Sequence, residues 1–298
     1  MGKMKKMKAY IKPLESSWAL EKVIHALTRY APDSVEIVND QNEANLVILH
    51  IIGRQDRTRR QAINIKRSRK RYAVIQYSLR STMRPSTEGW FPLWQGAALT
   101  WSYYNLKALC VEDGTSTDFP FYCAPLGVDT TIFYPRYYQE RQHVIGSSGP
   151  SWLTESVLEA TLAASSMGRS VFHLGPEKRR SSNVMYASGI EDDALADLLS
   201  QCEFVAGLRR TEGFELLAAE GLLCGARPIC FDRTHYRQWF DPWAIFIPEG
   251  SRKRVVDSLE AIFRSRIPPI TDAEIATAEK LFDWKTIIEG FWSRLWNL

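Results

Sequence analysis

A turn and a helix, directly after a strand, are predicted by the segment Thr211-Glu212-Gly213-Phe214-Glu215-Leu216-Leu217-Ala218-Ala219-Glu220-Gly221-Leu222-Leu223-Cys224-Gly225. The run before it, 204–208, is short and apolar, as in a buried strand. From Phe214 onward the apolar and small residues recur at helical spacing, and Gly225 is placed to end the helix. The amides of Gly213, Phe214 and Glu215 are therefore expected at a helix N-terminus, where unpaired donors and the helix dipole favour an anion.

Short apolar runs alternate with helical stretches on both sides of this segment. In the second half, helices are expected at about 154–166 and 192–201, and strands at 143–145, 171–174, 204–208, 228–231 and 244–247. The first half shows the same rhythm more weakly, with strands expected at 8–11, 35–38, 44–52, 72–77, 97–101 and 119–124. Strand and helix in turn predict parallel sheets with helices on both faces.

The length of 298 residues suits two domains of ordinary size. We therefore expect an α/β protein of two Rossmann-like domains that face each other across a cleft. The first domain is expected to span 1–138 and the second 139–285, with the boundary in the polar segment 135–142. The last helix, in 286–298, is rich in aromatic residues and is expected to pack back on the first domain.

Composition narrows the class of protein. With 45% hydrophobic and 24% charged residues the chain is typical of a globular protein, and no apolar run is long enough to span a bilayer. The N-terminal residues carry lysines but no long apolar stretch, so no secretion signal is expected and the protein is assigned to the cytoplasm. The five cysteines form no C-x-x-C pair, which indicates buried thiols rather than a zinc or redox site.

Several further segments accompany the quoted one in a fixed order: Pro125-Leu126-Gly127-Val128-Asp129 ahead of Phe133-Tyr134-Pro135, then Gly189 to Leu195, and finally Phe282-Asp283-Trp284. Glu212 and Glu220 have seven residues between them. With these signatures, roughly residues 120–298 resemble the retaining GT-B glycosyltransferases of the GT4-like group.

The resemblance implies transfer of a sugar from a nucleoside diphosphate sugar, with a UDP-sugar favoured, with retention, and with neither a cofactor nor a metal. In that family the second glutamate holds the nucleotide ribose and the first lies beside the donor sugar, so Glu220 and Glu212 are expected in these roles, with Glu212 as the catalytic candidate. The other expected donor-binding residues are Gly146, Ser147, Ser148, Arg209, Arg210, Gly213, Phe214 and Glu215.

The sequence departs from the family pattern at the expected phosphate site. Members commonly have a basic pair after the first strand of the second domain, but 146–152 contains no Lys or Arg. Backbone amides and hydroxyls can cradle a phosphate there, and Arg209 and Arg210 are the candidates to supply the missing positive charge. Glu215 stands where the family commonly has glycine, and it brings a further negative charge towards the donor. The first-domain histidine of the family has no clear counterpart.

A run of basic residues distinguishes the first domain from the second. Residues 54–71 hold nine basic side chains against the single acid Asp56. The run is either a solvated helix face, a surface for nucleic acid, or a surface for acidic lipid headgroups. Nearby aromatic residues, Trp90, Trp94, Trp101, Tyr103 and Tyr104, would stack on unpaired or flipped bases, bind a sugar acceptor, or form a compact core. The expected acceptor-binding residues are Arg54, Arg57, Arg59, Arg60, Lys66, Arg67, Arg80 and Arg84.

The favoured acceptor is DNA that carries a hydroxymethylated base, as small virus-type glycosyltransferases modify, and the alternative is a lipid or polysaccharide at a membrane surface. Two rival functions remain open. One is a non-catalytic nucleic-acid-binding protein on a decayed transferase fold. The other is an epimerase of the same fold that turns over a nucleotide sugar without any acceptor.

Overall fold

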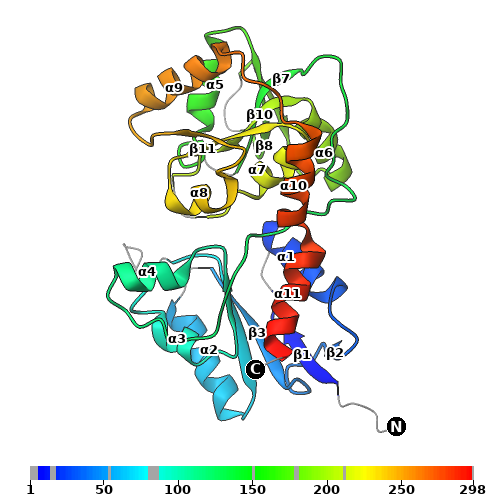
Figure 1. Cartoon of the computed structure of the whole chain (residues 1–298), viewed down its shortest axis with the longest axis vertical. Helices are drawn as coiled ribbons and strands as arrows, with labels where there is room; N and C mark the ends of the chain where they lie inside the picture. Colours follow the sequence, from blue (N-terminus) through cyan, green and yellow to red (C-terminus); the bar gives the residue numbers. More distant parts are fainter. Residues whose placement is uncertain are drawn as a thin grey trace. The chain divides into compact units, whose positions relative to one another are not determined.

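The computed structural model describes residues 6–13, 18–52, 55–79, 87–149, 152–177, 181–210 and 213–296. The chain divides into two compact units (Figure 1). The first contains Met1–Leu126 and Trp284–Leu298, and the second contains Gly127–Asp283. Each is built on one sheet of six parallel strands, so the two-domain α/β prediction is confirmed.

The first sheet has the strand order β2-β1-β3-β4-β5-β6. Its strands are β1 (Met7–Ile11), β2 (Val35–Ile37), β3 (Leu46–Ile51), β4 (Arg71–Gln76), β5 (Thr100–Ser102) and β6 (Phe121–Cys123). Its helices are α1 (Trp18–Arg29), α2 (Gln55–Arg67), α3 (Phe91–Gln95), α4 (Leu106–Glu112) and α11 (Trp284–Trp296). Every residue of β3 is buried, as expected for a central parallel strand that is covered on both faces.

The last helix, α11, belongs to the first unit although it ends the chain. It packs beside α1 (Figure 1), and the Trp292 indole donates a hydrogen bond to the Leu27 carbonyl at 3.3 Å. The Tyr122 hydroxyl of β6 donates to the Ile287 carbonyl at 3.0 Å, and the Phe291 ring lies 5.7 Å from the Trp101 ring. Aromatic side chains therefore hold α11 on the first sheet.

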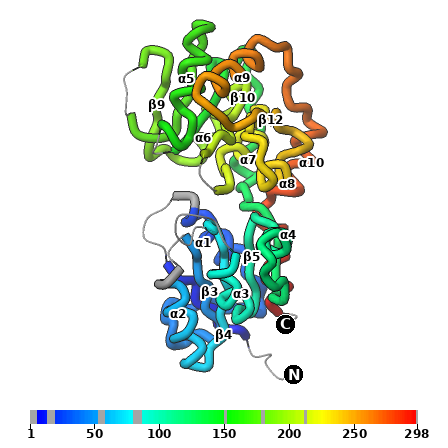
Figure 2. The backbone as a smooth tube through the Cα atoms, turned by 90° about the vertical axis from the view of Figure 1, so that its left-hand side faces the viewer, coloured from blue at the N-terminus to red at the C-terminus, as the bar shows by residue number. Residues whose placement is uncertain are grey.

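The second sheet has the strand order β12-β11-β10-β7-β8-β9. Its strands are β7 (His143–Ser148), β8 (Ser170–Leu174), β9 (Val184–Ala187), β10 (Cys202–Gly207), β11 (Arg227–Phe231) and β12 (Ile245–Ile247). Its helices are α5 (Val157–Ser165), α6 (Asp192–Ser200), α7 (Leu216–Leu223), α8 (Thr234–Phe240), α9 (Arg252–Arg264) and α10 (Asp272–Phe282). In the tube view α5 and α9 lie side by side, and α7 packs with α6 and α10 (Figure 2).

The expected boundary between the units differs from the observed one. The segment that follows Leu126 belongs to the second unit because its polar side chains pair there. Arg136 forms an ion pair with Asp193 of α6 at 2.5 Å, and the Tyr137 hydroxyl donates to Asp272 of α10 at 3.0 Å. The change of unit thus lies at 126/127 rather than at 138/139, and the chain returns to the first unit at 283/284 rather than at 285/286.

One strand was not anticipated. β9 is the edge strand of the second sheet, with four residues of which only Val184 is buried. Its residues, Val184-Met185-Tyr186-Ala187, are apolar, but the run is only four residues long, which is at the lower limit for a strand signal. Its identity comes from backbone pairing with β8 rather than from its own residues.

Gly221 in α7 is required by close packing on β10. A Cβ at this position would lie 2.8 Å from three side-chain atoms of Val205. We expect Gly221→Ala to lower the free energy of unfolding by about 1–3 kcal/mol, because a β-branched neighbour cannot move aside cheaply. Urea unfolding measures the loss. Combining it with Val205→Ala should cost less than the two single substitutions add up to; strict additivity would contradict this packing.

Candidate functional site

The candidate site lies where the order of the second sheet reverses. β7 leads through α5 to β8 on one side, and its other neighbour, β10, leads through α7 to β11 on the opposite side. In open α/β sheets ligands bind outside the carboxyl ends of the strands at such a topological switch point. The described parts of the two loops that leave β7 and β10, residues 149 and 152–156 and residues 208–210 and 213–215, therefore form the expected ligand site of this unit.

A buried ion pair joins these two loops. The Arg209 guanidinium donates through Nε and Nη2 to the two carboxylate oxygens of Glu155, both at 2.9 Å. The Glu155 side chain is only 5% exposed, and that of Arg209 is 31% exposed. Glu155 also packs against the loop after β7, since a Cβ at Gly149 would lie 2.5 Å from its Cγ. A bidentate, buried pair of this kind fixes the relative position of both loops.

Glu215 is the second carboxylate beside Arg209. Its Oε1 lies 3.4 Å from Arg209 Nε, and this atom makes no hydrogen bond in the part of the chain that the structure describes. Burial raises the pKa of Glu215 to about 7, and the charge of Glu155 acts in the same direction. Arg209, Tyr236 and Arg233 act against it. Near neutral pH this carboxyl group is therefore close to half protonated.

Arg210 and Arg233 also have carboxylate partners. Arg210 donates to Glu159 at 3.0 Å and to the Gly250 carbonyl at 3.0 Å. Arg233 pairs with Glu249 at 2.5 Å and donates to the Arg210 carbonyl at 2.8 Å. The sequence suggested Arg209 and Arg210 as free positive charges for a phosphate. In the structure, buried glutamates already balance both charges.

The other residues expected in the loop after β7 lie inside the strand. Gly146, Ser147 and Ser148 are the last residues of β7. Ser147 is 1% exposed, and its hydroxyl lies 3.0 Å from His173 Nδ1 on β8. The loop begins at Gly149, whose amide already donates to the Leu174 carbonyl at 3.1 Å.

The turn before α7 is placed as expected. Glu215 is the N-cap of α7, so Gly213 and Phe214 immediately precede the helix. Phe214 is 7% exposed and its ring stacks on Phe240 at 5.6 Å, which anchors the turn to α8. Glu220 lies inside α7 and is 1% exposed. The catalytic candidate, Glu212, lies outside the described residues.

Sequence reasoning missed the start of α5. Ser156, the N-cap residue, has a left-handed backbone with φ 53°, which is unusual for a residue other than glycine, and its side chain does not cap the helix. Over the described ranges, Trp152 Nε1, Ser156 Oγ and Glu159 Oε2 are buried without a hydrogen bond. Strained backbone and unsatisfied polar atoms concentrate at functional sites. Trp152 and Ser156 lie in the same loop as Glu155, and Glu159 lies in the first turn of α5.

Four side chains of the basic run lie on an exposed helix face. α2 buries Thr58, Ala62 and Ile65 against the sheet. The opposite side exposes four of the expected acceptor-binding residues, Arg59, Arg60, Lys66 and Arg67. Lys66 also lies over the Tyr72 ring at 5.8 Å. The side chain of Arg57, together with Arg54, Arg80 and Arg84, lies outside the described residues.

The aromatic residues near this helix do not form a stacking surface. Trp90, Trp94 and Trp101 are 0% exposed, Tyr103 3% and Tyr104 5%. The Trp94 and Trp101 indoles donate to Gln76 at 2.8 Å and to the Ala124 carbonyl at 3.0 Å. The hypothesis that they stack on bases is wrong, because these large side chains are buried in the core of the first unit.

Within the described ranges, no three His, Cys, Asp or Glu side chains are grouped so that they could hold a metal ion. Among the helices that the structure describes, none combines the length and the apolar character needed to cross a bilayer. That the reaction needs no metal stays a prediction.

Solved structures match the whole chain, whereas no protein-family model and no curated protein sequence does. HepE from Anabaena, in complex with UDP and glucose, is similar with a TM-score of 0.73 at 12% identity over 98% of this chain and 100% of that chain. Sucrose-phosphate synthase from Thermosynechococcus elongatus gives 0.75 at 12% identity over 98% of each chain. WaaG, a glycosyltransferase involved in lipopolysaccharide biosynthesis, gives 0.61 at 10% identity over 97% and 99%.

The chain has the GT-B fold. The expected fold class is therefore confirmed. Within this GT-B fold the switch point of the second sheet carries the loops that Arg209 and Glu155 join.

We expect Arg209→Met to lower the free energy of unfolding by about 3–5 kcal/mol near pH 8, because it leaves Glu155 and Glu215 buried without their cation. Arg237→Met is the matched control. Arg237 pairs with Asp232 and Asp241 at the surface, so its loss should cost less than about 1 kcal/mol. Urea unfolding of both variants measures the difference. Equal losses would show that the buried pair does not hold the loops.

Proposed function

We propose that the protein is a retaining glycosyltransferase that takes its sugar from a UDP-sugar. One observation carries this proposal: the strand-turn-helix that was expected to hold the donor lies at the switch point of a GT-B fold. A structurally similar protein, HepE, has been solved with UDP-glucose as well as with UDP and glucose. At this level of identity the likeness supports the fold, and the donor is our proposal.

In this proposal the diphosphate lies against the amides at the start of α7 and in the loop that begins at Gly149. Helix N-termini and glycine-rich turns provide oriented amides for an anion. These fixed dipoles stabilise the negative charge that develops on the leaving diphosphate. Glu220 accepts hydrogen bonds from the ribose, and Glu212 lies beside the donor sugar. Carboxylates suit both positions because each oxygen accepts more than one hydroxyl proton.

The positive charge on the first unit favours an acceptor that is anionic or that is part of a polyanion. The exposed side of α2 presents Arg59, Arg60, Lys66 and Arg67 over a helix of thirteen residues. We propose DNA with a hydroxymethylated base as the acceptor, since a row of arginines can neutralise several backbone phosphates. A lipid or polysaccharide at an acidic membrane surface is the alternative, because the same charges attract acidic headgroups.

A transfer assay read by mass spectrometry tests the reaction and the acceptor together. UDP- and GDP-sugars are offered with hydroxymethylated DNA, plain DNA and a lipid extract. We expect a gain of one sugar mass on the modified DNA, and loss of at least about tenfold in rate for Glu220→Gln and Glu212→Gln. Glu203→Gln is the control, because Glu203 lies at the start of β10 and pairs with Arg169.

Each result has a distinct meaning. Transfer of the sugar to lipid alone would support the proposed reaction and would exclude DNA as the acceptor. Turnover of donor without any acceptor points to the epimerase. Tight DNA binding with no use of any donor points to the decayed transferase and overturns the proposal.

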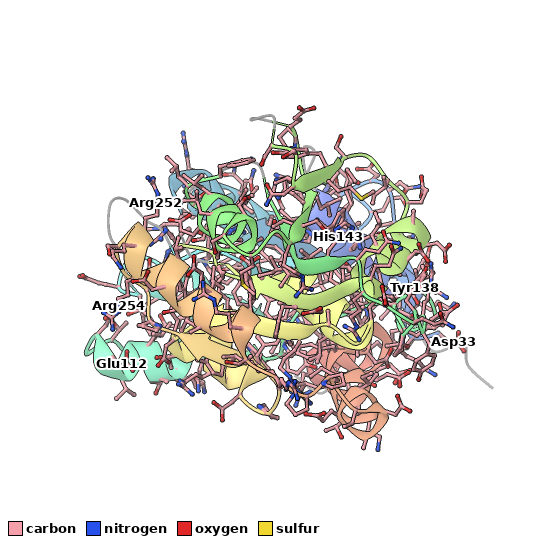
Figure 3. The ribbon with its side chains drawn as sticks, turned by 90° about the horizontal axis from the view of Figure 1, so that it is seen from above. Asp33, Glu112, Tyr138, His143, Arg252 and Arg254 are labelled. Atoms are coloured by element: carbon pink, nitrogen blue, oxygen red, sulfur yellow. The ribbon has the colours of Figure 1, made fainter. Side chains whose placement is uncertain are left out.

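A charge-neutralised α2 tests the acceptor surface. We expect replacement of Arg59, Arg60, Lys66 and Arg67 by Gln to weaken DNA binding and to flatten its salt dependence by about 0.9 in the log-log slope for each phosphate that the helix no longer neutralises. Arg252→Gln with Arg254→Gln is the control, because both residues point outward from the start of α9 in the second unit (Figure 3). His143, which is labelled in the same view, lies inside this unit. An unchanged slope in the α2 variant would contradict DNA binding by this helix.

A further inference from the structure

The ion-pair cluster at the switch point contains more acids than bases. Glu155 takes both Nε and Nη2 of Arg209, at 2.9 Å each. Glu215 has a longer contact to Nε, at 3.4 Å from its Oε1, and a side-chain hydrogen bond with Tyr236. Both glutamates are 6% exposed. Taking a carboxylate out of water is costly unless its charge is paired, and one guanidinium cannot satisfy two carboxylates equally.

The described groups that face Glu215 do not supply the missing charge. They come from every element packed around it: Arg209 after β10, Glu155 before α5, Cys230 in β11, and Arg233 and Tyr236 at α8. Glu249 balances Arg233 at 2.5 Å. Burial raises the pKa of Cys230, and a phenol is neutral at pH 7, so neither carries charge. The cluster has a net charge of minus one when Glu215 is ionised, and zero when it holds a proton.

This cluster touches the turn that is proposed to hold the diphosphate. A Cβ at Gly213 would lie 3.1 Å from Arg209 Nη1, so the turn is built against the guanidinium. Glu215 itself is the N-cap of α7, and its side chain does not cap the helix. A diphosphate at the start of α7 therefore lies within a few ångströms of the cluster, where charges interact strongly because little water separates them.

We propose that Glu215 couples donor binding to the uptake of one proton. The neutral carboxyl group admits the diphosphate, and the ionised carboxylate repels it. The buried glutamates already balance the charges of the arginines, so these charges are not available to the diphosphate. Protonation of Glu215 compensates for this, because it removes a negative charge from the site. This inference rests on the proposed function, because it concerns the same donor site. The proton comes from solvent, and it returns there when the diphosphate product leaves.

The coupling predicts a defined pH dependence. With a Glu215 pKa of about 7 before binding, affinity for the donor is nearly constant below pH 6. It falls by about tenfold between pH 6 and pH 8, because the binding-competent protonated form is lost. Glu215→Gln mimics the protonated state. Its affinity should stay within about twofold over the same range.

Calorimetry with UDP-glucose tests the coupling. Both of its phosphates are esterified, so the ligand itself does not titrate near neutral pH. Titrations at pH 8 in buffers of different ionisation enthalpy should give uptake of about one proton for the wild-type chain and for Glu203→Gln, and none for Glu215→Gln. Equal proton uptake by wild type and Glu215→Gln, or wild-type affinity that does not change with pH, would overturn the inference while the proposed function stands.

A second readout needs no donor. The raised pKa of Glu215 means that the native state binds this proton more tightly than the unfolded chain does. Wild-type stability should therefore fall relative to Glu215→Gln as pH rises from about 4.5 to 7, and the difference should stay constant above about pH 8. A difference that does not change with pH would overturn the inference. If the pH-dependent difference appears and UDP-glucose does not bind at any pH, the proposed donor fails and the coupling fails with it.

Discussion

One guanidinium shared by two buried carboxylates is the constraint on which the candidate site depends. Arg209 follows β10, and its bidentate bond to Glu155 ties the loop after β7 to the turn before α7. These are the two loops that a topological switch point brings together. Because neighbouring charges must be paired once they are buried, the ion pair also fixes where Glu215, the N-cap of α7, must lie.

Because of the same constraint, the groups that position the loops differ from the groups that are proposed to bind the ligand. Arg209 and Arg210 are held by Glu155 and Glu159, so their charges serve the local structure first. An anion at this site must then rely on oriented amides, which hold no net charge and need no carboxylate partner. Glu215 is consistent with such a site only when its charge is removed. The proposed donor chemistry and the proposed proton coupling thus have one origin, the excess of buried acid over base.

Much of the fold could be predicted from the sequence because apolar runs such as Leu46–Ile51 mark central parallel strands. The edge strand β9 could not, since Val184 is its only buried residue. The unit boundary shifted because Arg136 and Tyr137 pair with helices far along the chain. For the site, the helical spacing placed the turn before α7 correctly. The partnership of Arg209 with Glu155 was not visible, because the two are 54 residues apart and meet only through the sheet order.

Hydrogen exchange of the chain with and without UDP tests most directly whether the two loops at the switch point bind the donor. We expect UDP to slow exchange in the peptides that cover 149–159 and 208–218, because the amides there meet the diphosphate and the loops are tied through Arg209. Protection confined to the first unit, or no change in either loop at saturating UDP, would contradict this expectation.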